Sequence, residues 1–291
     1  MTRPQTKAQP LGIVRSLPID VYHADRSAIS NSGLNDMRRS PAHFHALHLD
    51  PNRPPPEDKR SHVDGNLMHC AALEPGEFAS RYKVGPINDK RLVEWKDWAK
   101  AVRKQLGYGV TLITPEQRDV AMAQAASIRA LPDVAALMSD GQAEVSAYWI
   151  DPVTGVRCRC RPDWRSPTGK RGRLSILLDL KGYGDVSARE FAVQVARMSY
   201  ARQAAMYSIG YEAASGYPVV GFCFIAVEER YPFAAAAYML PEEWLELGRR
   251  EYRELLDLYA KCLATNTWPR LQDGIQLLQM PAWVAREAER V

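Results

Sequence analysis

Long apolar runs are missing from this chain of 291 residues. No stretch approaches the roughly 18 uninterrupted apolar residues that a membrane-spanning helix needs. Residues 1–15 contain Pro4 and Pro10 and lack the apolar core of a signal peptide. We therefore expect a cytoplasmic protein with no membrane partner.

Cysteine is scarce. The five cysteines are an odd number and include no pair separated by two residues, so neither a disulfide framework nor a zinc ribbon is indicated. We expect reduced and mostly buried thiols at Cys70, Cys158, Cys160, Cys223 and Cys262.

Neither sign of charge is in large excess. The chain has 38 basic and 34 acidic residues, and a net charge of +4 does not by itself indicate a polyanionic partner. The distribution is uneven, because residues 157–173 hold seven basic residues against Asp163 alone, which is seven minus one, or +6. Such a patch fits a phosphate backbone. The basic residues are Arg157, Arg159, Arg161, Arg165, Lys170, Arg171 and Arg173.

The composition is that of an ordinary globular protein, with 46% hydrophobic and 25% charged residues. We find no convincing domain boundary. The order of helical and strand patterns predicts a single α+β domain over residues 1–291 with a central mixed sheet flanked by helices. It divides into a helical front part (1–135), a core sheet (140–240), and a C-terminal helix and tail (241–291).

Capping residues and hydrophobic periodicity predict the elements. Helices are expected at 33–39, 41–49, 63–73, 115–131, 187–214 and 241–264, the fifth opened by a capping-box pattern of Ser187 and Glu190. Strands are expected at 144–150, 156–161, 174–181, 219–227 and 233–239. The first three strands are consecutive in the chain, so they are expected to be neighbours.

Acidic residues stand at or near the ends of these three strands: Glu144, Asp163 and Asp179. Neighbouring strands would bring them together. Side chains alternate along a strand, so Asp179 and Lys181 share one face. Charges within an apolar strand are costly to bury unless they are paired or bind a metal. The residues alone leave a structural ion pair and a reactive site as alternatives.

Five motifs occur in order between residues 11 and 228. They are residues 29–34 leading to 40–44, residues 65–69 with 72–75, Arg161-Pro-Asp163, Leu178-Asp-Leu-Lys181, and Gln203-Ala-Ala-Met-Tyr207. In this order they resemble the PD-(D/E)XK nuclease superfamily. Within it, they resemble the RecB-type exonuclease branch and the phage exonucleases of the RecE (exonuclease VIII) type. Beyond residue 241 the resemblance is only general.

The resemblance implies a metal site. Asp163, Asp179 and the backbone carbonyl of Leu180 would supply oxygen ligands for Mg²⁺. His69 would reach the cation from the helical front part, and its imidazole makes Mn²⁺ an alternative. Glu144 resembles the early acidic residue of the superfamily, which binds the metal through water, although an ordinary edge-strand glutamate is an equal alternative.

The resemblance also implies catalytic roles. Lys181 would orient the attacking water and offset charge on the phosphate. Gln203 and Tyr207 lie on one helical face, where they would hold the catalytic strand or contact DNA, with ordinary packing as the alternative. Some relatives bind an iron–sulfur cluster through a cysteine at the position of Ser40, so no such cluster is expected here.

Two regions are candidates for DNA contact. Ser30, Ser32, Arg38 and Arg39 would lie beside helix N-termini, where amides and cations suit a terminal phosphate, and solvated caps are the alternative. The alternating stripe of Arg157, Arg159 and Arg161 would flank a DNA channel.

The predicted function is that of a Mg²⁺-dependent exodeoxyribonuclease acting on ends of linear double-stranded DNA. The resemblance implies 5′ to 3′ polarity, a 3′ overhang for recombination, a phage or prophage origin and a RecT-like single-strand annealing partner. It also implies a homo-oligomer, in which residues 217–238 or 268–283 could supply the contact surface. An endonuclease or flap nuclease, a non-catalytic DNA-binding module and an interaction scaffold are the alternatives.

Overall fold

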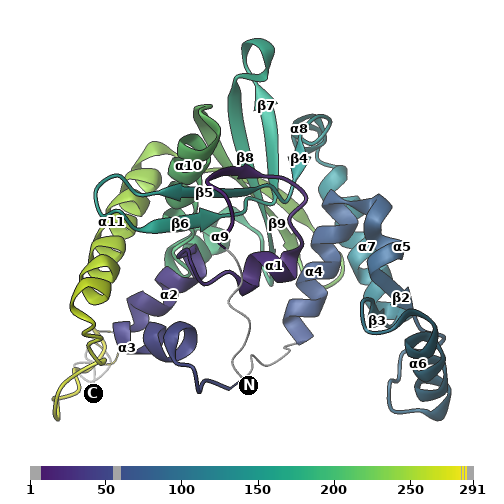
Figure 1. Cartoon of the computed structure of the whole chain (residues 1–291). Helices are drawn as coiled ribbons and strands as arrows, with labels where there is room; N and C mark the ends of the chain where they lie inside the picture. The colour runs from purple at the N-terminus through teal and green to yellow at the C-terminus, as the bar shows by residue number, and fades with distance from the viewer. Residues whose placement is uncertain (1–7, 55–59, 283, 285, 287–291) are drawn as a thin grey trace.

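The computed structural model describes residues 8–54, 60–282, 284 and 286 (Figure 1). Its strands are β1 Gly12–Val14, β2 Tyr82–Val84, β3 Thr111–Ile113, β4 Gln142–Ala143, β5 Ser146–Ile150, β6 Arg157–Cys160, β7 Trp164–Thr168, β8 Leu174–Tyr183, β9 Val219–Glu228 and β10 Ala235–Met239. Its α-helices are α1 Ile19–Ala24, α2 Asn31–Arg39, α3 Pro41–Phe44, α4 Arg60–Leu73, α5 Phe78–Arg81, α6 Val93–Leu106, α7 Pro115–Arg129, α8 Pro132–Leu137, α9 Ala188–Arg197, α10 Tyr200–Ser215 and α11 Glu242–Thr265. Short turns of other helix types are η1 His45–Leu49, η2 Pro75–Glu77 and η3 Lys170–Gly172.

The central sheet has five strands in the order β10-β9-β8-β7-β4. β8 and β9 are parallel, while β10 with β9, β7 with β8 and β4 with β7 are antiparallel. The parallel pair is connected through α9 and α10, because a parallel connection needs a crossover. The predicted α+β fold with a mixed sheet flanked by helices is confirmed.

Helices cover both faces of β8 and β9 (Figure 1). Leu178 and Leu180 lie in a core that includes residues of α4 and α7. Leu177 points to the other face of β8 and lies in the core on that side, with Phe191 of α9 and Ala204 of α10. Coverage on both faces explains why these strands are largely apolar in sequence.

The arrangement of the three consecutive strands was predicted wrongly. β5 and β6 pair with β1 in a separate three-stranded sheet, and they are not neighbours of β8. β8 lies between β9 and β7, and β7 is a strand that the sequence pattern missed. β7 reads Trp-Arg-Ser-Pro-Thr, and its polar residues and Pro167 argue against a strand.

The helical run over 187–214 is two helices. Ser199 has a left-handed backbone with φ of 51°, which ends α9 and starts α10. The side chain of Ser187 makes no capping hydrogen bond at the start of α9, so the expected capping box is absent there. A capping box forms instead at α7, between Thr114 and Gln117. Gly216 ends α10 with φ of 73°, as predicted.

The five cysteines are free and buried, as expected. In the described ranges, none of the helices combines the length and the apolar character that crossing a bilayer demands.

The backbones of α10 and α11 come close together at Gly248, where a Cβ would collide with the backbone carbonyl of Ala201. We expect Gly248→Ala to lower the free energy of unfolding by about 2 kcal/mol or more, because backbone cannot move aside cheaply. Gly65→Ala is the control, since a Cβ there meets nothing within 4 Å in helix α4. That change should be neutral or stabilising by about 0.5–1 kcal/mol. Equal effects in denaturant titrations would contradict the packing argument.

Candidate active site

The site begins where β7 leaves β8. Pairing of the two strands runs from Thr168 opposite Leu174 to Trp164 opposite Leu178. Continuing this register would place Pro162 opposite Leu180, and proline has no N–H to donate. The β7 side of Leu180 is therefore free of strand pairing and open to side chains.

Two side chains occupy this backbone position. The Leu180 N–H donates to Asp163 Oδ2 at 2.7 Å. His69 of α4 places Nε2 3.2 Å from the Leu180 carbonyl oxygen and Nδ1 3.6 Å from Asp163 Oδ2. Three segments that are far apart in sequence thus meet at one peptide of β8.

Glu144 joins the group from the end of β4. Its backbone has φ of 53°, and its N–H donates to the Asp163 carbonyl at 3.0 Å. One ligand atom from each of His69, Glu144 and Asp163 lies within 4.8 Å of the others. The predicted grouping of Glu144 with Asp163 is present, although it comes from β4 and β7 and not from three neighbouring strands.

Asp179 and Lys181 lie beside this cluster on the face of β8 that α10 covers. Lys181 Nζ is 2.6 Å from Asp179 Oδ2, and Gln203 Nε2 of α10 donates to Asp179 Oδ1 at 2.6 Å. The Lys181 ammonium also lies 4.6 Å from the centre of the Tyr200 ring. Asp179 is 2% exposed. Asp179 and Lys181 share one face of β8, as predicted, and form an ion pair, so both carboxylate oxygens of Asp179 are directed to neighbouring side chains.

The carboxyl groups of the cluster resist losing their protons. Burial and the charge of Asp179 raise the pKa of Asp163 well above its usual range. Burial and the charge of Asp163 raise the pKa of Glu144 to about 7. Burial lowers the pKa of His69, which keeps its imidazole neutral and able to bind a metal. For Lys181, burial lowers the pKa, but attraction to Asp179 outweighs it and the net shift is upward.

A divalent cation fits this donor set. Two buried carboxyl groups that repel one another gain stability from a positive charge between them. Carboxylate and carbonyl oxygens suit Mg²⁺, and the imidazole of His69 also suits Mn²⁺. His69, Glu144 and Asp163 would hold the ion, with the Leu180 carbonyl oxygen, which His69 already approaches, as a further ligand.

Tyr207 is placed differently from Gln203. It packs edge to face on Phe222 at 6.3 Å between ring centres, and burial raises its pKa well above the usual range. Gln203 contacts the Asp179 carboxylate, whereas Tyr207 packs into the core one turn away.

The arginines at 157, 159 and 161 lie against the N-terminal segment, and the burial of Arg159 corrects its expected place beside a DNA channel. Arg159 is only 7% exposed, donates to the Tyr22 carbonyl and lies over the Tyr22 ring. Arg161 donates to Glu144 Oε2 at 2.8 Å and to the Leu17 carbonyl at 3.0 Å. Arg157 donates to the Gln9 carbonyl. These contacts leave Arg159 buried away from any phosphate.

The α2 N-terminus is capped by Ser30, whose Oγ accepts the Gly33 N–H and lies 2.9 Å from Ser32 Oγ. Arg38 donates to Ser199 Oγ at 2.6 Å, whereas Arg39 is exposed at the last residue of α2.

The sequence reasoning missed Arg202, which is fully buried beside this helix. It donates to Asn31 Oδ1 at 3.2 Å and lies 3.9 Å from Glu251 Oε2. The signal available in the sequence was that Arg202 is the single arginine among the small residues of α10.

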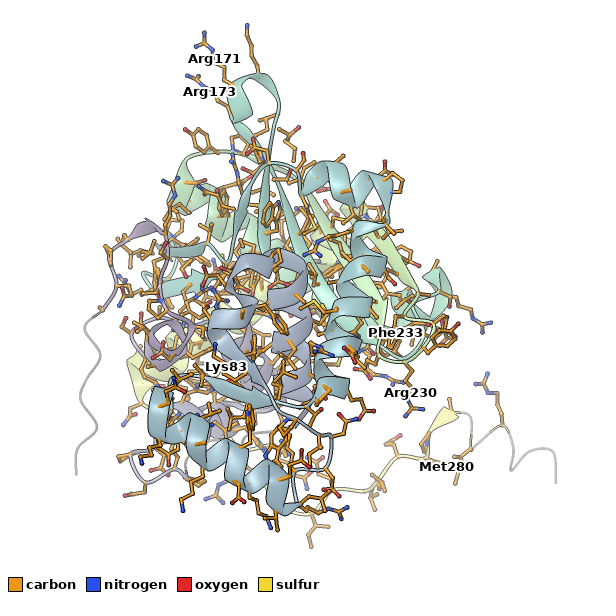
Figure 2. All side chains as sticks on the ribbon, turned by 90° about the vertical axis from the view of Figure 1, so that its right-hand side faces the viewer. Lys83, Arg171, Arg173, Arg230, Phe233 and Met280 are labelled. Carbon is orange, nitrogen blue, oxygen red and sulfur yellow. The ribbon has the colours of Figure 1, made fainter. Side chains whose placement is uncertain are left out.

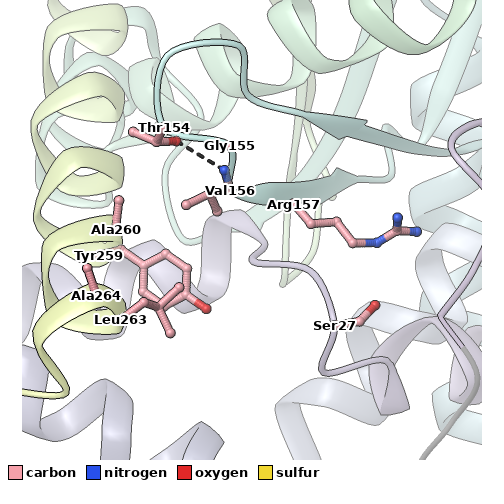
Figure 3. A pocket seen from close by; sticks show the side chains of 9 residues that line it. All are labelled: Ser27, Thr154, Gly155, Val156, Arg157, Tyr259, Ala260, Leu263 and Ala264. Carbon is pink, nitrogen blue, oxygen red and sulfur yellow. Dashed lines mark hydrogen bonds between the residues drawn. The ribbon is translucent and has the colours of Figure 1, made fainter.

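A surface pocket of about 410 Å³ lies elsewhere, between α11 and the β5–β6 turn (Figure 3). None of the residues of the acidic cluster lines it. Its lining residues are Ser27, Thr154, Gly155, Val156, Arg157, Tyr259, Ala260, Leu263 and Ala264.

The central mixed sheet carries an Asp-x-Lys pair on a buried strand, and this pair lies beside the cluster of His69, Glu144 and Asp163. Together these features define a nuclease-like domain of the PD-(D/E)XK class. The chain belongs to the family described as PDDEXK-like domain of unknown function (DUF3799), whose model matches residues 30–281. The superfamily assignment is thereby confirmed.

One solved structure supports the fold. The crystal structure of a "Putative exonuclease" from Eubacterium rectale has a TM-score of 0.59 and 12% identity, and the match covers 96% of this chain and 100% of the other. The match with the crystal structure of SSO0001 covers 69% of this chain and 88% of that chain at 13% identity, with a TM-score of 0.29. No curated protein matches the chain.

The raised pKa values predict a pH-dependent response to metal. The pKa of Glu144 is about 7 in the folded protein, against 4.5 for an ordinary glutamate. The folded state therefore holds the proton more tightly than the unfolded state, and the metal-free protein loses stability as the pH rises through 7. Protons then compete with metal at low pH. We expect Mn²⁺ or Mg²⁺ at a hundredfold excess over Kd to stabilise by about 3 kcal/mol at pH 8 and much less at pH 5.5.

Thermal unfolding with and without metal measures this difference. Glu144→Gln and His69→Ala should each reduce the metal-induced shift at pH 8, since each removes a donor. Asp119→Asn, on exposed helix surface, should leave it unchanged. A shift of equal size at both pH values would contradict the proposed competition.

Proposed function

We propose that this protein is a metal-dependent exodeoxyribonuclease of the RecE type, which degrades linear duplex DNA from its ends. The observation that carries the proposal is the Lys181–Asp179 pair next to the cluster of His69, Glu144 and Asp163. A fixed cation beside a metal-binding cluster is what hydrolysis of a phosphodiester needs.

Each residue has a distinct task. When bound, a divalent cation supplies Lewis acidity and lowers the pKa of a bound water. Lys181 Nζ orients the attacking water and stabilises the negative charge that develops on the phosphate. Asp179 holds Lys181 Nζ at 2.6 Å, and Gln203 holds Asp179 in turn, so the ammonium is in place before substrate arrives. Gln203 is a positioning residue in this scheme.

Recognition of a DNA end would involve Ser30 and Ser32 at the α2 N-terminus, which offer hydroxyls to a terminal phosphate. Arg38, in the last turn of α2 and hydrogen-bonded to Ser199 at the start of α10, would add a cation. In the proposed reaction, digestion runs 5′ to 3′ and leaves a 3′ strand that passes to a RecT-like annealing protein in a phage or prophage setting. A homo-oligomer would keep the enzyme on its substrate. Of its candidate contact regions, 268–283 ends at Trp283, which lies outside the described residues.

An assay with linear duplex DNA tests the proposal. Each strand carries a different fluorophore at its 5′ end, and a covalently closed circle is included. We expect early loss of both 5′ labels with Mg²⁺ or Mn²⁺, none with EDTA, and an intact circle. Asp179→Asn and Lys181→Met should lower the rate at least about 10³-fold by removing electrostatic stabilisation.

These variants should retain most DNA affinity, because backbone contacts dominate binding. Their fold is checked by thermal unfolding. Cutting of the circle would move the assignment to an endonuclease or flap nuclease. If the folded wild-type protein cleaves neither the linear DNA nor the circle in either metal, the protein would instead be assigned as a non-catalytic DNA-binding module.

The β7–β8 hairpin ends in a basic tip formed by Lys170, Arg171 and Arg173 (Figures 1 and 2). All three residues are exposed, and within the described part of the chain none of them forms an ion pair with a carboxylate. Arg165 braces the hairpin by donating to the Gly172 carbonyl at 2.8 Å and to Ser175 Oγ at 3.0 Å. The tip is therefore a preformed cationic contact for a DNA backbone.

Removing this tip should change the salt dependence of binding. If Arg171 and Arg173 each neutralise one phosphate, the double alanine variant should reduce the slope of log K against log salt by about 1.8 for duplex DNA. The control is the double variant Arg91→Ala and Arg189→Ala, which removes two arginines that pair with carboxylates elsewhere. Equal slopes for the two double variants would refute a DNA contact at the tip.

A further inference from the structure

The turn between β9 and β10 carries an exposed aromatic tip, which we define as Arg230, Tyr231 and Phe233. Tyr231 is 87% exposed, Arg230 is exposed and Phe233 is partly exposed. The two rings are arranged edge to face, with centres 6.3 Å apart and planes at 84°. Figure 2 shows Arg230 and Phe233 at a different end of the molecule from Arg171 and Arg173.

The backbone of this turn is braced from within and from the side. The Phe233 N–H donates to the Arg230 carbonyl at 2.8 Å, and the Glu228 N–H donates to the Ala234 carbonyl at 2.9 Å. From α7, Gln124 Nε2 donates to the Glu228 carbonyl at 2.9 Å. A braced turn presents its rings at low cost in conformational entropy, which favours their use as a binding surface.

Strand register places the aromatic tip beside the candidate active site. Lys181 of β8 is opposite Ala226 of β9, and Tyr183 is opposite Glu228. The Glu229 N–H, at the start of the turn, donates to the Tyr183 carbonyl at 3.2 Å. At roughly 3.3 Å per residue, the turn starts about 10 Å along the sheet from Lys181, which is about the length of three base pairs of duplex DNA.

The charges around the tip indicate which part of a nucleic acid it contacts. Glu228 and Glu229 are next to it in the chain, and their carboxylates repel phosphates. An aromatic face stacks on any base, and such stacking tolerates all sequences. Arg230 adds a guanidinium that can stack on a base as well. The surface therefore suits bases better than backbone.

We infer that the aromatic tip stacks on an unpaired base at the end of the DNA substrate, close to the phosphate that is cut. The inference deepens the proposed function, on which it rests, by assigning a single-stranded base contact. An end-acting nuclease has to separate the strand that it cuts from its complement, and a stacking surface holds the separated base. Tyr231 is a positioning residue, because it does not touch the reacting atoms.

Binding measured without cleavage tests this inference. The probe is duplex DNA with a three-nucleotide unpaired end, carrying the fluorescent base 2-aminopurine at one position from 1 to 6. Protein with Lys181→Met in EDTA serves as the inactive background. We expect stacking to quench one or two of these positions, and Tyr231→Ala to abolish the quenching and weaken binding about tenfold. Tyr231→Phe should retain both properties, because it keeps the ring.

The matched control is Tyr108→Ala. Tyr108 is 86% exposed, in the turn after α6, where it lies beneath the Arg103 guanidinium. It is as exposed as Tyr231 but belongs to a different part of the fold, so its removal should change neither quenching nor affinity.

The other outcomes are distinguishable. If the inactive protein binds DNA and Tyr231→Ala gives the same quenching and affinity, the inference is wrong and the proposed function stands. If no variant binds DNA, both fail together. If light scattering shows that Tyr231→Ala dissociates an oligomer while the quenching stays, the tip is a contact between copies of the chain and the inference is overturned.

Discussion

The candidate site depends on one interruption of strand pairing, at the peptide of Leu180. β7 pairs with β8 as far as Leu178 and then departs, because the next residues before Trp164 are Asp163 and Pro162. The Leu180 N–H donates to Asp163, and the Leu180 carbonyl faces His69. Buried backbone groups must be satisfied, so this peptide holds both side chains in register with β8.

The same interruption explains the electrostatics of the site. Asp163 and Asp179 come from adjacent strands and are buried within reach of one another's charge, which is unfavourable unless cations compensate. Lys181 compensates Asp179 directly and Arg161 compensates Glu144, whereas Asp163 forms no ion pair with a lysine or arginine among the described residues. A divalent cation at the cluster would supply the positive charge that Asp163 lacks.

Surfaces around this centre divide the tasks that a nuclease would need. At one end of β8 the hairpin presents three cations without carboxylate partners among the described residues. Near the other end, the β9–β10 turn presents aromatic rings beside two glutamates. The basic residues earlier in the same stretch, Arg159 above all, instead anchor the N-terminal segment to β6. A single basic run in the sequence thus has two different physical roles.

Local chemistry in the sequence determined the class of fold, most helices and the placement of Asp179 and Lys181 on one face of a strand, because alternation and capping act over a few residues. Only the tertiary structure decided that Glu144 and Asp163 meet through β4 and β7, and that Arg159 is buried. The polar, proline-containing β7 is a strand because β8 offers it a partner, which no local pattern records. Contacts between distant segments depend on strand order, and strand order is a property of the whole chain.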